Sequence, residues 1–166
     1  HLMKRTPVII RLDGKAFHTF TRGLNKPFDK IMVNTMIDTT YDLCRNIQGC
    51  VFGYTQSDEI TLVLCDYQTL ETAAWFDYQV QKMCSVAASM CTMYFNKNFR
   101  YWVDHFKSTM TDTASNRKYL EVLQKKFDMA MFDARCFNIP KEEVTNCILW
   151  RQNDATRNAI QMLAQA

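Results

Sequence analysis

The spacing of hydrophobic residues changes several times along the first half of the chain, and each spacing predicts one kind of element. Apolar residues alternate with mixed ones over 8–13, which is the period of a half-buried strand. Over 28–47 and again over 72–95 they recur every three or four positions, which predicts two amphipathic helices. Between these helices, strands at 50–55 and 59–65 are predicted to form a hairpin around a polar turn.

The second half of the chain continues with a helix predicted near 117–127 and a strand over 131–139. Pro140 then opens a last predicted helix, because proline is favoured in the first turn. The predicted order is β-α-β-β-α-β with a trailing helix. We therefore expect an α+β fold of the ferredoxin-like palm type, in which an antiparallel sheet carries helices on one face and leaves the other free for ligands.

Length and composition fit a single domain. The chain has 166 residues, of which 48% are hydrophobic, and this is enough for one sizeable core. We interpret His1-Leu2 as a remnant of an expression vector and Met3 as the natural start. The prediction is one domain over 3–166, with a basic helical insertion at about 96–128.

Charge, cysteines and hydropathy narrow the classes of protein that fit. The net charge is only +3, but between 97 and 126 seven basic residues stand against three acidic ones, which an RNA partner or a solvated helix face explains equally well. Seven cysteines without a Cys-x-x-Cys pair favour small core residues over zinc ligands or disulfides. No run is apolar enough to span a bilayer and no signal peptide is present, so we predict a cytoplasmic protein without membrane contact.

Two acidic residues at the ends of predicted strands carry the main functional signal. Asp13 closes the first strand directly before Gly14, and Asp58 lies in the hairpin turn. Asp13 alone could be an ordinary turn former with Gly14, but together the two acids place two carboxylates at one edge of the sheet. Few carboxylates, completed by water and phosphate oxygens, suit Mg²⁺, and two such ions can hold the attacking and leaving oxygens of a phosphoryl transfer. The pattern thus predicts a metal-dependent nucleotidyl-transfer site.

The alternation of the hairpin leaves open which acid of Asp58-Glu59 faces that site. In a regular strand, Asp58 would share the buried face of Ile60, and Glu59 would face the ligand. If Asp58 belongs to the turn itself, the alternation does not apply to it. We favour the second interpretation.

Several motifs, in this order, resemble the histidine-tRNA guanylyltransferase superfamily over about residues 7–154. They are Arg11-Leu12-Asp13-Gly14-Lys15-Ala16-Phe17-His18-Thr19-Phe20, Lys26-Pro27-Phe28-Asp29, Gln56-Ser57-Asp58-Glu59, Phe132-Asp133-Ala134-Arg135 and Trp150-Arg151-Gln152-Asn153-Asp154. The resemblance implies a palm-like enzyme that adds nucleotides to the 5′ end of tRNA, with two Mg²⁺ ions as cofactors and GTP and ATP as substrates. It also implies a homo-oligomer such as a tetramer and a further C-terminal region.

The resemblance also implies roles for individual residues. Asp13, the backbone carbonyl of Gly14 and Asp58 would hold the metal ions, and Glu59 would support this catalytic site. At the triphosphate, the implied contacts are the backbone amides of Ala16, Phe17 and His18 and the side chains of Lys26 and Lys82. Asp29 and Ser57 would line the nucleotide pocket. Arg11 would contact the tRNA end. These roles fit the chemistry, because phosphoryl transfer depends mainly on positioning and charge neutralisation.

One departure from the family bears on the substrate. The guanylyltransferases proper carry His-Ile-Asn-x-x-Tyr-Asn shortly after Trp-Arg-Gln, whereas residues 156–162 read Thr-Arg-Asn-Ala-Ile-Gln-Met. The chain is therefore more similar to the guanylyltransferase-like branch, and the predicted function is template-dependent repair of truncated tRNA 5′ ends. The alternatives are G addition to histidine tRNA, a nucleotide cyclase on the same palm fold, and a non-catalytic RNA-binding module of the RRM type.

Overall fold

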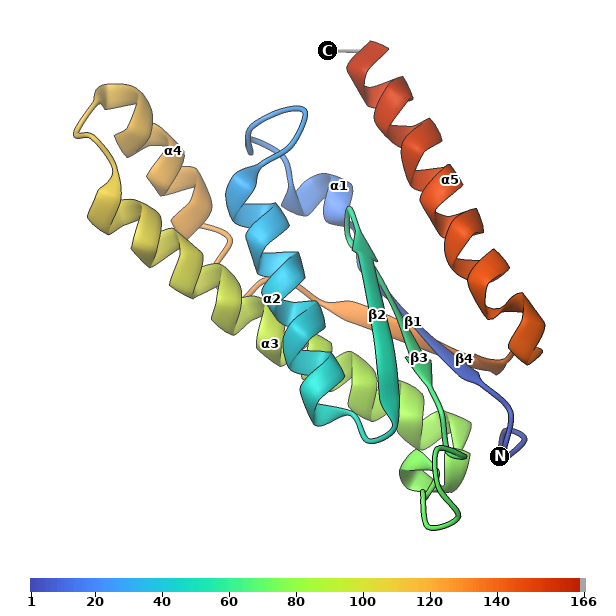
Figure 1. Cartoon of the computed structure of the whole chain (residues 1–166). Helices are drawn as coiled ribbons and strands as arrows, with labels where there is room; N and C mark the ends of the chain where they lie inside the picture. The colour runs from blue at the N-terminus through green and yellow to red at the C-terminus, as the bar shows by residue number, and fades with distance from the viewer. Residues whose placement is uncertain (165–166) are drawn as a thin grey trace.

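The computed structural model describes residues 1–164, so the last two positions of the predicted domain lie outside it. Eleven elements follow one another along this part of the chain (Figure 1). They are β1 (Val8–Gly14), α1 (Phe17–Phe20), α2 (Lys30–Asn46), β2 (Cys50–Gln56), β3 (Glu59–Leu64), η1 (Trp75–Tyr78), α3 (Val80–Thr109), α4 (Ala114–Gln124), β4 (Phe132–Asn138), η2 (Lys141–Glu143) and α5 (Val144–Ala164).

The four strands form one antiparallel sheet in the order β2-β3-β1-β4. Helices α2 and α3 cover one face of this sheet, and α5 passes over the other (Figure 1). The predicted fold class, an α+β palm with an antiparallel sheet and a trailing helix, is confirmed. The second face is open only in part, because α5 lies across it.

The hydrophobic core lies between the sheet and helices α2 and α3. On β1 and β3 the core-facing side chains alternate as predicted, and all of them are fully buried. On α3 a buried residue recurs every four positions, which is the period of a helix face that packs on a sheet. These α3 residues are Met83, Ala87, Cys91, Phe95, Phe99 and Val103.

Helix α3 differs from the helix predicted over 72–95. It starts at Val80, because residues 75–78 form the short helix η1, where Phe76 and Asp77 have left-handed backbone angles. It continues to Thr109, since the four-residue period of buried side chains runs on through Val103. The stretch expected to be a separate basic insertion at 96–128 is therefore the second half of α3 followed by α4.

The remaining elements lie close to their predicted positions. Thr113 caps α4 by accepting a hydrogen bond from the amide of Asn116, so this helix begins three residues before the predicted start. All seven cysteines are free. Within residues 1–164 no helix is long and apolar enough to cross a membrane.

Five phenylalanines join α1 to the main core. The ring of Phe17 contacts those of Phe20, Phe95 and Phe132 at centroid distances of 4.9 to 5.4 Å, and Phe95 stacks on Phe99 at 5.9 Å. Aromatic pairs at such distances add stability beyond their buried area. This cluster fixes the segment that follows Asp13.

Replacing Phe95 with alanine should therefore destabilise the protein strongly. Phe95 is fully buried, and loss of such a ring costs about 3–5 kcal/mol through transfer and cavity terms. Urea unfolding followed by circular dichroism measures the change. Tyr101→Ala on the same helix, where the side chain is 60% exposed, is the matched control, and equal losses in both variants would contradict this description of the core.

Candidate active site

Three carboxylates lie side by side on adjacent strands, on the face opposite the main core. Asp13 of β1 pairs with Glu59 of β3 and with Asp133 of β4. Residues opposite each other in an antiparallel pair point to the same face, so the three side chains form one row. Sequence reasoning quoted Asp133 within a motif but gave it no role, because its partner on β1 depends on the sheet order.

The pKa of Asp13 is raised above its ordinary value. Partial burial is the largest cause, followed by the negative charge of Asp58 and then those of Asp133 and Glu59. Arg135 opposes these effects and lowers the pKa. A carboxyl whose pKa is raised by neighbouring acids marks a place where negative charge is not neutralised within the chain.

Asp58 lies in the hairpin turn, as favoured above, and Glu59 is the first residue of β3. Ser57, the residue before Asp58, has a left-handed backbone (φ 50°), and its hydroxyl donates a hydrogen bond to Asp58 Oδ1 at 3.1 Å. The amide of Gly14 donates to the carbonyl oxygen of Asp58 at 3.1 Å. This bond holds the turn against the end of β1, so Asp13 and Asp58 reach the same edge of the sheet.

Glu59 is buried and already has two cationic partners. Arg151 of α5 donates from Nε and Nη2 to its two carboxylate oxygens at 2.8 and 2.9 Å, and Arg11 donates from Nη2 to Oε2 at 2.7 Å. Glu59 is therefore placed to support the site and not to offer a free carboxylate. The sequence marks Arg151 as part of a motif but assigns it no role, because its partner Glu59 lies 92 positions away.

The segment after Asp13 has the shape expected of a phosphate-binding loop. Ala16 adopts a left-handed backbone (φ 54°) and starts the four-residue helix α1. The amides of Phe17 and His18 have no partner within so short a helix. A Cβ on Gly14 would lie 2.3 Å from the buried ring of Phe17, so only glycine fits there. Lys26 is exposed in the loop that follows α1.

Asp29 and Lys82 are placed differently from their predicted roles. The Asp29 carboxylate accepts bonds from the amides of Ile31, Met32 and Asn25 and from the Tyr119 hydroxyl, so it caps α2 and its nucleotide contact stays a prediction. Lys82 lies in the first turn of α3, over the ring of Phe76.

The position of Lys82 corrects the predicted phosphate contact. Two residues further along α3, the Cys84 sulfur lies 3.3 Å from that of Cys136 near the middle of β4, whereas the Thr92 hydroxyl accepts from the amide of Phe132 at the end beside Asp13. Lys82 is therefore at the opposite end of the sheet. The prediction that it neutralises a triphosphate at Asp13 is wrong for a site within one chain.

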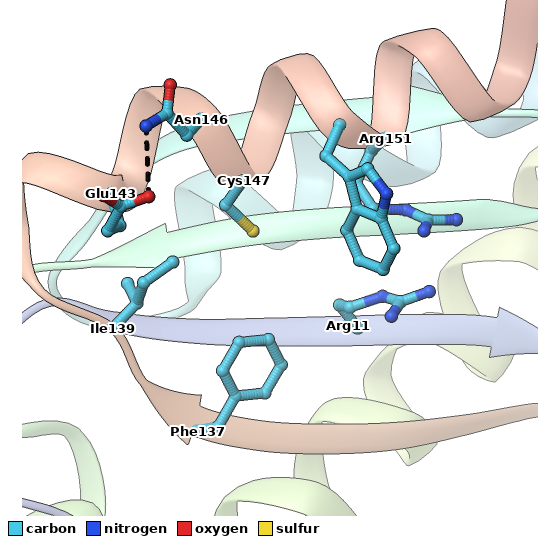
Figure 2. Close-up of a pocket in the computed structure, with 8 residues that line it drawn as sticks. Arg11, Phe137, Ile139, Glu143, Asn146, Cys147 and Arg151 are labelled. Carbon is cyan, nitrogen blue, oxygen red and sulfur yellow. Dashed lines mark hydrogen bonds between the residues drawn. The ribbon is translucent and has the colours of Figure 1, made fainter.

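A pocket of about 370 Å³ lies between α5 and the sheet, beside the row of acids. Figure 2 shows Arg11 and Arg151 at one end of it, and Glu143 with Asn146 at the other. Phe137 and Cys147 line its middle. The Arg11 side chain thus borders both the pocket and the carboxylate of Glu59.

The donors near Asp13 can be tested for their fit to a metal. Within residues 1–164 no group of three or more histidine, cysteine, aspartate or glutamate side chains is arranged to hold an ion. Mg²⁺, however, needs only one or two carboxylates when phosphate and water oxygens complete its shell. The charge that raises the pKa of Asp13 is the charge that a divalent cation would neutralise, so Asp13, Asp58 and the Gly14 carbonyl fit Mg²⁺.

Comparison with known proteins agrees with this geometry. The family model described as "Thg1: tRNAHis guanylyltransferase" matches residues 1–140. The chain therefore belongs to the tRNA(His) guanylyltransferase family, and the resemblance seen in its motifs is confirmed.

Protein R259 of Acanthamoeba polyphaga mimivirus is 34% identical over 165 residues, which cover 93% of this chain and 54% of that protein. The tRNA(His) guanylyltransferase of Schizosaccharomyces pombe is 28% identical, covering 95% and 52%. The chain thus spans about half the length of these relatives.

Solved structures give the same result. A bacterial tRNA(His) guanylyltransferase (Thg1)-like protein in complex with ATP superposes with a TM-score of 0.82 at 39% identity, covering 99% of this chain and 63% of that one. Its complex with GTP gives 0.80 at 38% identity, covering 99% and 68%. The tRNA(His) guanylyltransferase of Saccharomyces cerevisiae, at 20% identity and a TM-score of 0.67, shares the fold and covers 92% of this chain and 59% of its own.

The raised pKa of Asp13 predicts a gain in stability when its charge is removed. The folded state holds this proton more tightly than the unfolded state, so the stability that it contributes is complete at low pH and is lost as the pH rises through the folded-state pKa. Without divalent cations, Asp13→Asn should therefore need more urea to unfold than the wild type at pH 7. The difference should vanish below about pH 4, where Asp13 is protonated in both states.

Asp77→Asn is the control for this measurement. Asp77 is an exposed acid near the N-terminus that pairs with Lys4, so its removal should not stabilise the protein. An Asp13→Asn protein that is less stable than the wild type at pH 7 would show that the carboxylates do not repel one another.

Proposed function

We propose that this chain is the palm of a nucleotidyltransferase that repairs truncated tRNA, adding nucleotides to its 5′ end in the 3′-to-5′ direction and choosing each by pairing with the opposite strand. The 5′ end is first activated by a nucleoside triphosphate. The observation that carries the proposal is the meeting of Asp13 and Asp58 at one edge of a palm sheet, with unneutralised charge at Asp13. Family membership supports the same chemistry.

Each part of the site has a task in this reaction. Asp13, Asp58 and the carbonyl of Gly14 would hold two Mg²⁺ ions, which supply charge neutralisation and orient the attacking and leaving oxygens. The amides of Ala16, Phe17 and His18, with the side chain of Lys26, would bind the triphosphate. Arg11, which borders the pocket beside the acids, would contact the RNA end.

Two observations favour tRNA repair over G addition to histidine tRNA. The chain is 39% identical to a bacterial Thg1-like protein, but 28% identical to the tRNA(His) guanylyltransferase of Schizosaccharomyces pombe. Residues 156–162, part of α5, lack the His-Ile-Asn-x-x-Tyr-Asn element of the enzymes proper. A nucleotide cyclase and a non-catalytic RNA-binding module are the alternatives that the experiments below exclude or support.

Replacing Asp58 should abolish both steps of the reaction. Asp58→Asn keeps the size of the side chain and removes the charge that would bind the metal, so activation of the 5′ end and nucleotide addition should each fall by roughly 100-fold or more. Release of labelled phosphates and extension of the RNA measure the two steps. Asp112→Asn, which removes an exposed acid between α3 and α4, is the control. Near-normal turnover in Asp58→Asn would refute the proposed site.

The choice of the added base should follow the template. With tRNAs that lack one 5′ nucleotide, changing the opposite nucleotide of the acceptor stem should switch which triphosphate is incorporated, in tRNAs of several anticodons. Sequencing of the products reads this directly. Addition of G whatever the opposite base, confined to a histidine anticodon, would support the alternative, and a cyclic nucleotide formed without RNA would identify a cyclase.

The position of Lys82 connects the proposal to oligomeric state. Because Lys82 is far from Asp13 within one chain, it could reach a triphosphate only in the site of a second copy, in a homo-oligomer such as the family resemblance implies. If it does so, mixed oligomers of Asp58→Ala and Lys82→Ala chains should regain activity that neither variant shows alone. A mixture of Asp13→Ala and Asp58→Ala chains, which damage the same site, should regain none. Equal behaviour of the two mixtures would remove Lys82 from the proposal.

A further inference from the structure

We infer that Arg151 is a positioning residue of the proposed transfer site: it fixes the Glu59 carboxylate, and through Glu59 it sets the turn that carries Asp58 and leaves Arg11 free for the RNA. This inference rests on the proposed function and extends it to α5, an element to which that proposal gives no catalytic task. It is carried by a buried set of charged hydrogen bonds that joins β1, β3 and α5.

Arg151 has a fixed orientation between two acids. Its side chain is 9% exposed, and its Nε and Nη2 bind both oxygens of Glu59 in the planar, paired geometry that a guanidinium provides. On the other side, Nη2 also donates to Asp154 Oδ2 at 3.0 Å, one turn along α5. A side chain held by both neighbours cannot reorient without breaking several bonds, so it serves as a rigid support for Glu59.

Glu59 transmits this support to both candidate metal ligands. It follows Asp58 directly in the chain, and it pairs with Asp13 across the sheet. The turn has a further tie to β1 in the bond from the Gly14 amide to the Asp58 carbonyl. Without Arg151, the Glu59 carboxylate would keep its bond to Arg11 and a long one from the Thr61 hydroxyl at 3.5 Å, and its charge would compete with Asp13 and Asp58 for a cation.

Arg151 also determines how many hydrogen-bond donors of Arg11 are left unused by Glu59. By taking both oxygens of Glu59, it limits Arg11 to one bond, made by Nη2. The Nε of Arg11 is buried and has no hydrogen-bond partner within residues 1–164. The same side chain lines the pocket under α5, as Figure 2 shows. The Arg11 side chain as a whole is 25% exposed, so guanidinium donors that do not bind Glu59 remain for an RNA phosphate, and an unsupported Glu59 would draw them away.

The test compares Arg151→Ala and Arg151→Lys with Arg157→Ala, an exposed arginine of the same helix that lies at the longer distance of 4.0 Å from Asp154. Lysine keeps the charge but cannot make the paired bonds. The affinity for Mn²⁺ in the presence of a non-hydrolysable GTP analogue, measured by electron paramagnetic resonance, should fall in both Arg151 variants, by up to the roughly 10- to 100-fold seen when residues that orient metal ligands are replaced. Arg157→Ala should keep the wild-type affinity.

Two further readouts separate positioning from a general loss of structure. Hydrogen exchange at the Gly14 amide should accelerate in the Arg151 variants, while exchange at the core strand residues Ile10 and Leu62 stays unchanged. In Arg151→Ala the kcat for 5′-end extension should fall with little change in the KM for GTP, and added guanidinium should restore it in part. Should Arg151→Ala fail to fold, Arg151→Lys carries the same comparison.

The outcomes decide the inference in either direction. Unchanged Mn²⁺ affinity and unchanged exchange at Gly14, with only a lower melting temperature, would overturn it and leave Arg151 a structural residue. If the wild type transfers no nucleotide to any RNA, the proposed function fails, but the Mn²⁺ and exchange comparisons still decide the positioning role. A wild type that does not bind Mn²⁺ would overturn both.

Discussion

The candidate site depends on one buried carboxylate held by two arginines. Burying the charge of Glu59 costs free energy, and the charged bonds from Arg151 and Arg11 offset most of that cost. Removing one partner of such a pair destabilises a protein by about 3–5 kcal/mol, because an uncompensated charge is left behind. The interaction joins the first strand, the hairpin and the last helix, so the sheet edge and α5 form one structural unit.

The same interaction separates two kinds of acid at the sheet edge. Glu59 is neutralised within the chain, whereas Asp13 stands among acids that raise its pKa. Negative charge that the protein does not neutralise is a requirement for binding a divalent cation, and it reduces stability until the cation arrives. The aromatic cluster around Phe17 then holds the following loop in place, so the candidate phosphate-binding amides are fixed relative to the acids.

The features that the sequence predicted correctly are those that depend on residues close together in the chain. Alternation on β1 and the polar turn of the hairpin predicted these strands and placed Asp58 in the turn, since both depend on neighbouring residues alone. The start of α3 was wrong because the left-handed backbone at Phe76 and Asp77 has no marker such as glycine. The misplaced contact of Lys82 and the missed role of Arg151 have another cause: both follow from how distant segments pack, and periodicity does not report that.

The central claim is that Asp13 and Asp58, and not Glu59, hold the catalytic metal ions. Crystals grown with Mn²⁺ and a non-hydrolysable GTP analogue test it directly, because anomalous scattering locates Mn²⁺ without assumptions about the protein. Anomalous peaks are expected at the carboxylates of Asp13 and Asp58 and at the carbonyl of Gly14, with Glu59 still bonded to Arg151. A peak on Glu59, or Mn²⁺ bound away from the end of β1, would contradict it.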